Sequence, residues 1–151
     1  MFKSRFPEAD YYMMELFNRS LELSKKSYEY CPGVSLYPNE IHTVEYIAES
    51  STTNMTDIAN RMGITKGAVT KMVAKLEEQG LLVRYKYRPS QKEIYVHLTE
   101  LGVRAYEGHK AYHAVMRQRL SSSFDGLDRD HQQTILDFLE RYLAEMNNLE
   151  N

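Results

Sequence analysis

The sequence predicts a mainly α-helical protein with one small β-hairpin. Several segments repeat apolar residues at the i, i+3, i+4 spacing of amphipathic helices, and two consecutive segments alternate in polarity as strands do. A length of 151 residues fits a single domain of ~100–200 residues. With 42% hydrophobic and 26% charged residues, the chain has the composition of a globular protein and not that of a disordered one.

The first two predicted helices lie before residue 50. About residues 8–29 form the first, because apolar side chains recur on one face at helical spacing. The Cys-Pro-Gly run at 31–33 ends it, since proline cannot continue a helix and glycine tolerates the turn. Pro38 suits the first turn of the second helix, whose apolar face runs from Ile41 to Ala48.

The centre of the chain is its most informative part. Thr56 precedes a short helical segment at 57–62 and is placed to cap it. Gly63 then permits a sharp turn, after which Thr65 caps the next helix at about residues 65–79. A helix, a glycine turn and a second helix with small and basic residues near its start are typical of a helix-turn-helix.

A hairpin and two long helices are expected to follow. Residues 82–87 and 93–98 are rich in β-formers and alternate in polarity, and the link between them is short and basic. They therefore predict the wing of a winged helix-turn-helix. Thr99 is placed to cap a long fifth helix, and Asp128 to cap the last helix after a break at 121–123.

Basic charge is concentrated in the centre of the chain. Residues 54–104 hold nine Lys and Arg against five Asp and Glu, whereas the rest holds ten against sixteen, and the net charge is −2. A basic module between acidic flanks is typical of a DNA-binding lobe within a larger scaffold. An ordinary solvated face has the same pattern, so charge alone leaves both interpretations open.

Other classes of function lack support in the sequence. It has no Gly-rich phosphate loop, nucleophile elbow or HExxH motif, so we do not expect an enzyme. No stretch approaches the ~18 apolar residues of a membrane span, and the N-terminus lacks an apolar signal segment. The single cysteine, Cys31, cannot form an intramolecular disulfide. We therefore expect a cytoplasmic protein that has no membrane partner.

Four short motifs share their order and spacing with a known family. They are MTDIA at 55–59, GITKGAVT at 63–70, LEEQGLL at 76–82 and LTELG at 98–102. Through them the chain resembles the MarR family of transcriptional regulators. The resemblance implies a winged helix-turn-helix lobe at 38–104, with a recognition helix at about 65–79 and a wing at about 83–98.

The recognition helix and the wing are expected to contact a double-stranded DNA operator. The expected contact residues are Thr65, Lys66, Gly67, Thr70 and Lys71 on the helix and Arg88, Ser90, Gln91 and Lys92 on the wing. Lysine and threonine mostly hold phosphates, while the first turns of the helix reach base edges in the major groove. Ser90 and Lys92 stand where the family usually carries an aspartate and an arginine. Contact of the wing with the backbone or the minor groove then falls to Arg88 or Lys92.

The first and last helices are too apolar for one small lobe to cover. This favours a homodimer in which segments 1–37 and 105–151 supply the dimerisation helices of a single domain, residues 1–151. As a repressor of this family, the dimer would respond to a small effector or metal ion through a shift in the distance between its two recognition helices. The alternative of another class is a helix-turn-helix that only assembles proteins, which would lack the steep salt dependence of DNA binding.

Three histidines suggest a metal as the effector. His109 and His113 stand at i, i+4 on the fifth helix, the spacing with which a helix presents two metal ligands, and His42 lies near the start of the second helix. The arrangement resembles the zinc-responsive branch of the MarR family. The resemblance implies a zinc site of these histidines with Cys31, Glu40 or Glu107 as further ligands. The alternative is that the histidines are solvated or pair with acids.

Overall fold

The structure is a computed structural model that describes residues 4–86 and 93–148. Helices dominate these residues and strands are short, so the predicted mainly α-helical fold is confirmed. The chain divides into two compact units, residues 1–110 and 111–151. Among the described residues, no helix is both long enough and apolar enough to cross a membrane.

The N-terminal segment is a helix followed by a small hairpin. Helix α1 spans Phe6–Ser24, and strands β1 (Tyr28–Cys31) and β2 (Val34–Leu36) pair antiparallel. The expected helix up to residue 29 is therefore wrong in its last turn, and residues 25–37 are not part of a helix. The Pro-Gly pair makes the hairpin turn instead, because Gly33 adopts a φ of +80° and its N–H donates to Glu29 Oε1 at 2.8 Å.

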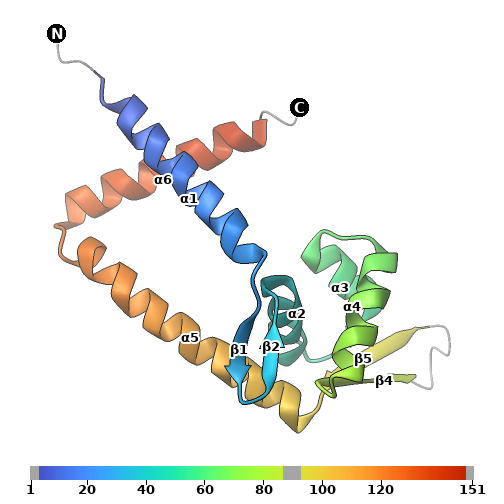
Figure 1. Cartoon of the computed structure of the whole chain (residues 1–151). Coiled ribbons are helices and arrows are strands. Elements are labelled where there is room, and N and C mark those ends of the chain that lie inside the picture. The colour runs from blue at the N-terminus through green and yellow to red at the C-terminus, as the bar shows by residue number, and fades with distance from the viewer. Residues whose placement is uncertain (1–3, 87–92, 149–151) are drawn as a thin grey trace. The chain divides into compact units, whose positions relative to one another are not determined.

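The next elements form the predicted helix-turn-helix and wing. They are α2 (Pro38–Glu49), β3 (Thr53–Asn54), α3 (Met55–Met62), α4 (Lys66–Glu78), β4 (Leu82–Lys86) and β5 (Ile94–Leu98). The strands form one antiparallel sheet in the order β3-β5-β4. The sequence did not predict the two-residue strand β3. Figure 1 shows α3 and α4 beside the strands of the wing.

Polar side chains set the ends of the two short helices. Asn54, and not Thr56, caps α3: its Oδ1 accepts from the N–H groups of Thr56 and Asp57 at 2.8 and 2.9 Å. Gly63 ends α3 in the left-handed conformation with a φ of +63°, as its place in the turn predicts. Thr65 caps α4 as expected, since its Oγ1 accepts from the N–H of Ala68.

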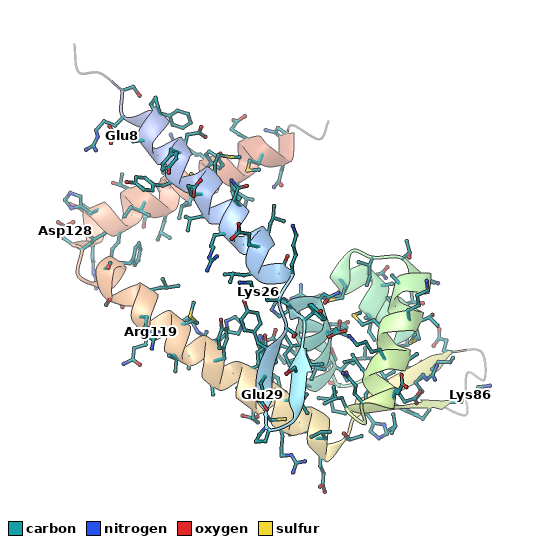
Figure 2. All side chains as sticks on the ribbon, viewed as in Figure 1. Glu8, Lys26, Glu29, Lys86, Arg119 and Asp128 are labelled. Carbon is teal, nitrogen blue, oxygen red and sulfur yellow. The ribbon has the colours of Figure 1, made fainter. Side chains whose placement is uncertain are left out.

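The apolar faces of α2, α3, α4 and the sheet meet in one core; Figure 2 shows the side chains of this lobe. Its fully buried members are Leu36, Ile41, Val44, Ile58, Val69, Val73, Leu76, Leu81, Leu82 and Ala105. Because α4 contributes Val69, Val73 and Leu76, one face of this helix is fixed in the core. The opposite face is left for other contacts.

Two glycines let the start of α5 (Glu100–Asp125) approach neighbouring backbone closely. A Cβ atom on Gly102 would lie 2.0 Å from the carbonyl oxygen of Leu81, and one on Gly108 would lie 1.7 Å from that of Tyr30. Thr99 caps the helix as predicted, since its Oγ1 accepts from the N–H of Gly102 at 3.2 Å. The glycine of the LTELG motif is therefore explained by backbone contact.

The second unit consists of the rest of α5 and helix α6 (Arg129–Asn148). The break expected at 121–123 is wrong, because α5 continues to Asp125; the Ser122 hydroxyl bonds to the carbonyl of Arg119 within the helix. Asp128 caps α6 as predicted, since its Oδ1 accepts from the N–H of His131 at 2.9 Å.

Candidate DNA-binding surface and histidine cluster

The outward face of α4 carries the residues expected to contact DNA. Thr65, Lys66, Gly67, Thr70 and Lys71 are all exposed. The hydroxyl of Thr70 donates to the carbonyl of Lys66 at 2.9 Å, which leaves its oxygen able to accept and fixes the side chain along the helix. Two lysines and two hydroxyl groups on one exposed helix face can bind an anionic surface.

The glycine on this face has no packing role. A Cβ atom on Gly67 would meet no atom closer than Thr65 Oγ1 at 4.0 Å, and its φ is not positive. This differs from Gly102 and Gly108, where the protein's own backbone excludes a side chain. Among the described residues, a side chain at position 67 would meet only an ordinary van der Waals contact.

The wing is attached to the end of α4 by an ion pair. Arg84 of β4 donates from Nε to Glu77 Oε2 at 2.8 Å, and its backbone N–H donates to Oε1 of the same carboxylate at 3.3 Å. This hydrogen bonding lowers the pKa of Glu77 and raises that of Arg84. The expected wing contacts Arg88, Ser90, Gln91 and Lys92 lie outside the described residues.

A second ion pair attaches α4 to α2. Lys75 Nζ lies 2.5 Å from Glu40 Oε1 and 5.2 Å from the ring centre of Tyr37. The side chain of Glu40 is almost fully buried, and its other oxygen accepts from the N–H of Tyr37 at 2.9 Å. The recognition helix is thereby held to the first turn of α2.

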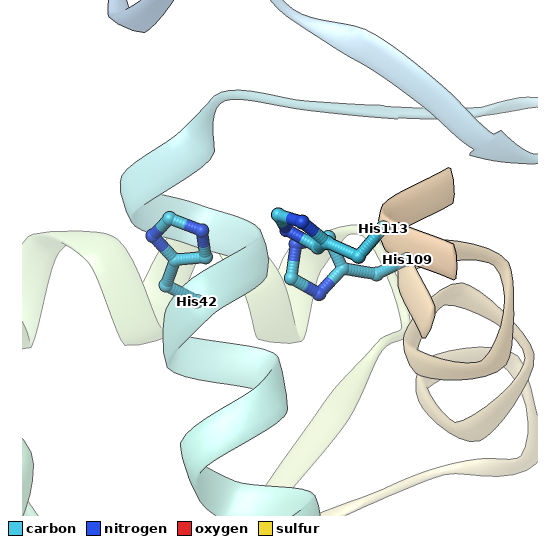
Figure 3. Close-up of side chains that lie close together, drawn as sticks. All are labelled: His42, His109 and His113. Carbon is cyan, nitrogen blue, oxygen red and sulfur yellow. The ribbon is translucent and has the colours of Figure 1, made fainter. Parts of the chain in front are cut away.

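The structure brings the three predicted histidines together (Figure 3). One ligand atom from each of His42, His109 and His113 lies within 4.8 Å of the others. His42 is exposed on α2, His109 is buried on α5, and His113 follows His109 by one turn of the same helix. The ring centres of His42 and His109 are 5.3 Å apart.

The chemistry of this group fits zinc. Neutral imidazole is a preferred zinc ligand, and two nitrogens bound at ~2.0–2.1 Å can lie at most about 4.2 Å apart, so small side-chain rotations suffice. The expected further ligands do not join the three histidines among the described residues. Glu40 is engaged by Lys75, Glu107 lies 3.9 Å from Lys110, and Cys31 packs against the lobe core.

One residue near the cluster was missed by sequence reasoning. Oε1 of Glu45 lies 3.6 Å from Nδ1 of His109. Glu45 stands three residues after His42 on α2, so it shares a helix face with that histidine. The shared face with His42 was visible in the sequence, whereas the contact with His109 on another helix was not.

Comparison with known proteins identifies the family. Residues 36–94 match the family model described as MarR family. The uncharacterized HTH-type transcriptional regulator YhjH of Bacillus subtilis is 34% identical over 125 residues, which cover 83% of this chain and 69% of that protein. The chain belongs to the MarR family. The HTH-type transcriptional regulator PchR of Bacillus subtilis is 29% identical over 67% of this chain and 60% of its own length. Members of this family are DNA-binding transcription regulators and not enzymes, which confirms that prediction.

Solved structures show the same fold. Lactococcus lactis ZitR, a zinc-responsive MarR family member, has a TM-score of 0.81 at 20% identity and covers 95% of this chain and 99% of its own. Streptococcus pneumoniae FabT in complex with DNA has a TM-score of 0.73 at 19% identity, with the same two coverages. The predicted winged helix-turn-helix fold is confirmed.

Proposed function

We propose that this protein represses transcription by binding a DNA operator as a homodimer, with α4 in the major groove and the wing on the backbone or in the minor groove. The observation that carries the proposal is the two-sided α4. Its inner face is buried in the core, while Lys66, Thr70 and Lys71 are exposed on the other side of the helix. Such a face suits phosphates and base edges.

Gly67 supports close approach to DNA. Because no part of the chain that the structure describes excludes a side chain there, the small residue is better explained by a partner that comes near the backbone of α4. The solved structure of FabT contains DNA, in agreement with this use of the fold.

The homodimer is supported by the apolar surfaces of α1 and α6. Among the described residues of these two helices, none is buried, although each carries large apolar side chains. The exposed ones include Tyr11, Leu16 and Leu21 on α1 and Leu136, Leu139 and Leu143 on α6. Apolar faces of this extent mark an interface between protein chains.

The recognition-helix assignment is tested by Thr70→Ala combined with Lys71→Ala, measured by fluorescence anisotropy with operator DNA at two salt concentrations. We expect binding weaker by about 10- to 100-fold and a salt slope reduced by about one per lost phosphate contact. The matched control is Lys25→Ala with Lys26→Ala, two exposed lysines after α1 (Lys26 is labelled in Figure 2). Unchanged affinity in the α4 variant would contradict the proposal, and binding without salt dependence would favour a protein-assembly module.

A second candidate function is that of a zinc-dependent repressor, which the histidine cluster specifically favours. His42, His109 and His113 would hold the ion, and the fold neighbour ZitR is zinc-responsive. Bound zinc supplies a cross-link between α2 and α5 and would raise operator affinity if the linked form fits DNA better. Calorimetry of zinc binding to the wild type and to His109→Ala/His113→Ala tests this. Equal, weak binding in both proteins would assign the effector to another chemical class.

A further inference from the structure

We propose that Glu45 is the positioning residue of the histidine cluster. Its carboxylate accepts the Nδ1–H of His109 and so leaves Nε2 of that ring as the metal ligand. This inference rests on the zinc site proposed above. It adds Glu45, which is not among the residues predicted to bind the metal.

The proposal begins with the contact between the two side chains. Glu45 Oε1 lies 3.6 Å from Nδ1 of His109, and the imidazole is 1% exposed whereas the carboxylate is 34% exposed. A shortening of about 0.5–0.9 Å produces a hydrogen bond of ordinary length. The carboxylate faces one defined nitrogen of a ring that solvent does not reach.

This contact determines which nitrogen carries the proton. A neutral imidazole has one N–H and one lone pair, and a carboxylate accepts but does not donate when it is ionised. If Nδ1–H points to Glu45, the lone pair is on Nε2. Metal-bound histidines commonly donate their other N–H to a carboxylate, which fixes the ring and raises its basicity.

The residues packed around His109 also restrict the orientation of its ring. The ring of Tyr30 packs edge-on against it with centres 5.3 Å apart, and the backbone of Tyr30 contacts Gly108 beside it. Glu45 itself is free to shorten the contact, because it lines a surface pocket of about 340 Å³ together with His42 and Glu49. The movable partner is the carboxylate and the fixed partner is the imidazole.

Glu49 offers a matched control. It lies one turn after Glu45 on α2 and lines the same pocket, but its carboxylate accepts from the hydroxyl of Tyr106 at 3.2 Å. Replacing it removes the same charge from the same pocket without touching His109. An effect of charge alone would therefore appear in both variants.

The experiment compares the full-length wild type with Glu45→Ala, Glu45→Gln and Glu49→Ala. Zinc affinity is measured by competition with a chelator, and the tautomer of His109 is measured from imidazole ¹⁵N shifts before and after zinc is added. We expect Glu45→Ala to bind zinc about 10- to 100-fold more weakly. Glu45→Gln should recover most of this loss, because its amide oxygen can still accept from Nδ1, and Glu49→Ala should stay within about threefold of the wild type.

The outcomes separate the two proposals. If the wild type binds zinc and Glu45→Ala binds it equally well, or if His109 carries its proton on Nε2 in the wild type, the role of Glu45 is refuted while the zinc site stands. An equal loss in Glu45→Ala and Glu49→Ala would also refute it, because it would show an effect of charge alone. If the wild type itself binds no zinc, both proposals fail.

Discussion

Gly102→Ala tests the contact between α5 and the turn at residues 79–81 (the corner), which joins α4 to β4. The added Cβ atom would lie 2.0 Å from the carbonyl oxygen of Leu81 and 3.2 Å from Cβ of Leu98. Real Cβ atoms essentially never come within 3.0 Å of another atom, so α5 or the corner must shift by about 1 Å. That carbonyl also accepts from the N–H of Thr99 at 3.0 Å, a bond the shift would weaken.

The magnitude follows from three opposing effects. Overpacking of this kind costs about 1–3 kcal/mol, and loss of a backbone hydrogen bond costs about 0.5–1.5 kcal/mol. Alanine is favoured over glycine inside a helix by at most about 1 kcal/mol. We therefore expect Gly102→Ala to lower the free energy of unfolding by about 0.5–3.5 kcal/mol, although helix propensity alone predicts a gain.

The assay is urea unfolding followed by circular dichroism, with protomer concentration held constant. Gly67→Ala is the matched control: it makes the same substitution in a helix where no atom lies closer than 4.0 Å, so we expect unchanged or slightly raised stability. A Gly102→Ala protein as stable as the wild type would refute the close contact described for this glycine.

Three further outcomes are expected. If the histidine cluster binds zinc as proposed, Gly108→Ala should weaken that binding as well as stability, because its Cβ would meet the carbonyl oxygen of Tyr30 at 1.7 Å beside the cluster; zinc binding by chelator competition unchanged from the wild type would contradict this. The hydrogen bond from Arg84 lowers the pKa of Glu77 in the folded state, so its contribution to stability is present above the unfolded pKa of about 4.3 and is lost as pH falls through the lower folded value. Thermal unfolding of Glu77→Gln and wild type should therefore differ at pH 6 and converge on acidification, and a constant difference would exclude this linkage. Asp128→Ala should destabilise the start of α6 through loss of its cap, seen as faster amide hydrogen exchange in the first turn of that helix, and unchanged exchange would contradict this role.

The helix-turn-helix and the wing could be predicted because their signals are local. Apolar periodicity, Gly63 and the cap at Thr65 all lie within a few residues of the structure that they determine. The hairpin at 28–36 was missed because its strands are very short. Over so few residues, the alternation of apolar and polar side chains in a strand cannot be told from the pattern at the end of a helix. Asn54 and Thr56 are both good capping residues, and their local sequence does not rank them.

The histidine cluster was predicted from spacing and a family resemblance, and the side chains do come together. The partners of Glu40 and Glu45 could not be predicted. Both glutamates lie on α2, whereas their partners Lys75 and His109 lie on α4 and α5. Glu40 was expected near a metal and instead pairs with Lys75, while Glu45 faces His109 across the α2–α5 contact. Such pairings depend on how helices pack, which no local pattern encodes.

The pairing of Lys75 with Glu40 limits how an effector signal can travel. His42 and Glu40 belong to the same rigid helix, and α2 shares a close-packed core with α4, so a displacement of His42 carries the recognition helix along unchanged. An effector bound at the histidines would then reorient the DNA-binding lobe as a rigid body, without changing the internal structure of that lobe. Two spectroscopic labels within the lobe would keep their distance during induction, while labels on the two recognition helices of a dimer would report the change.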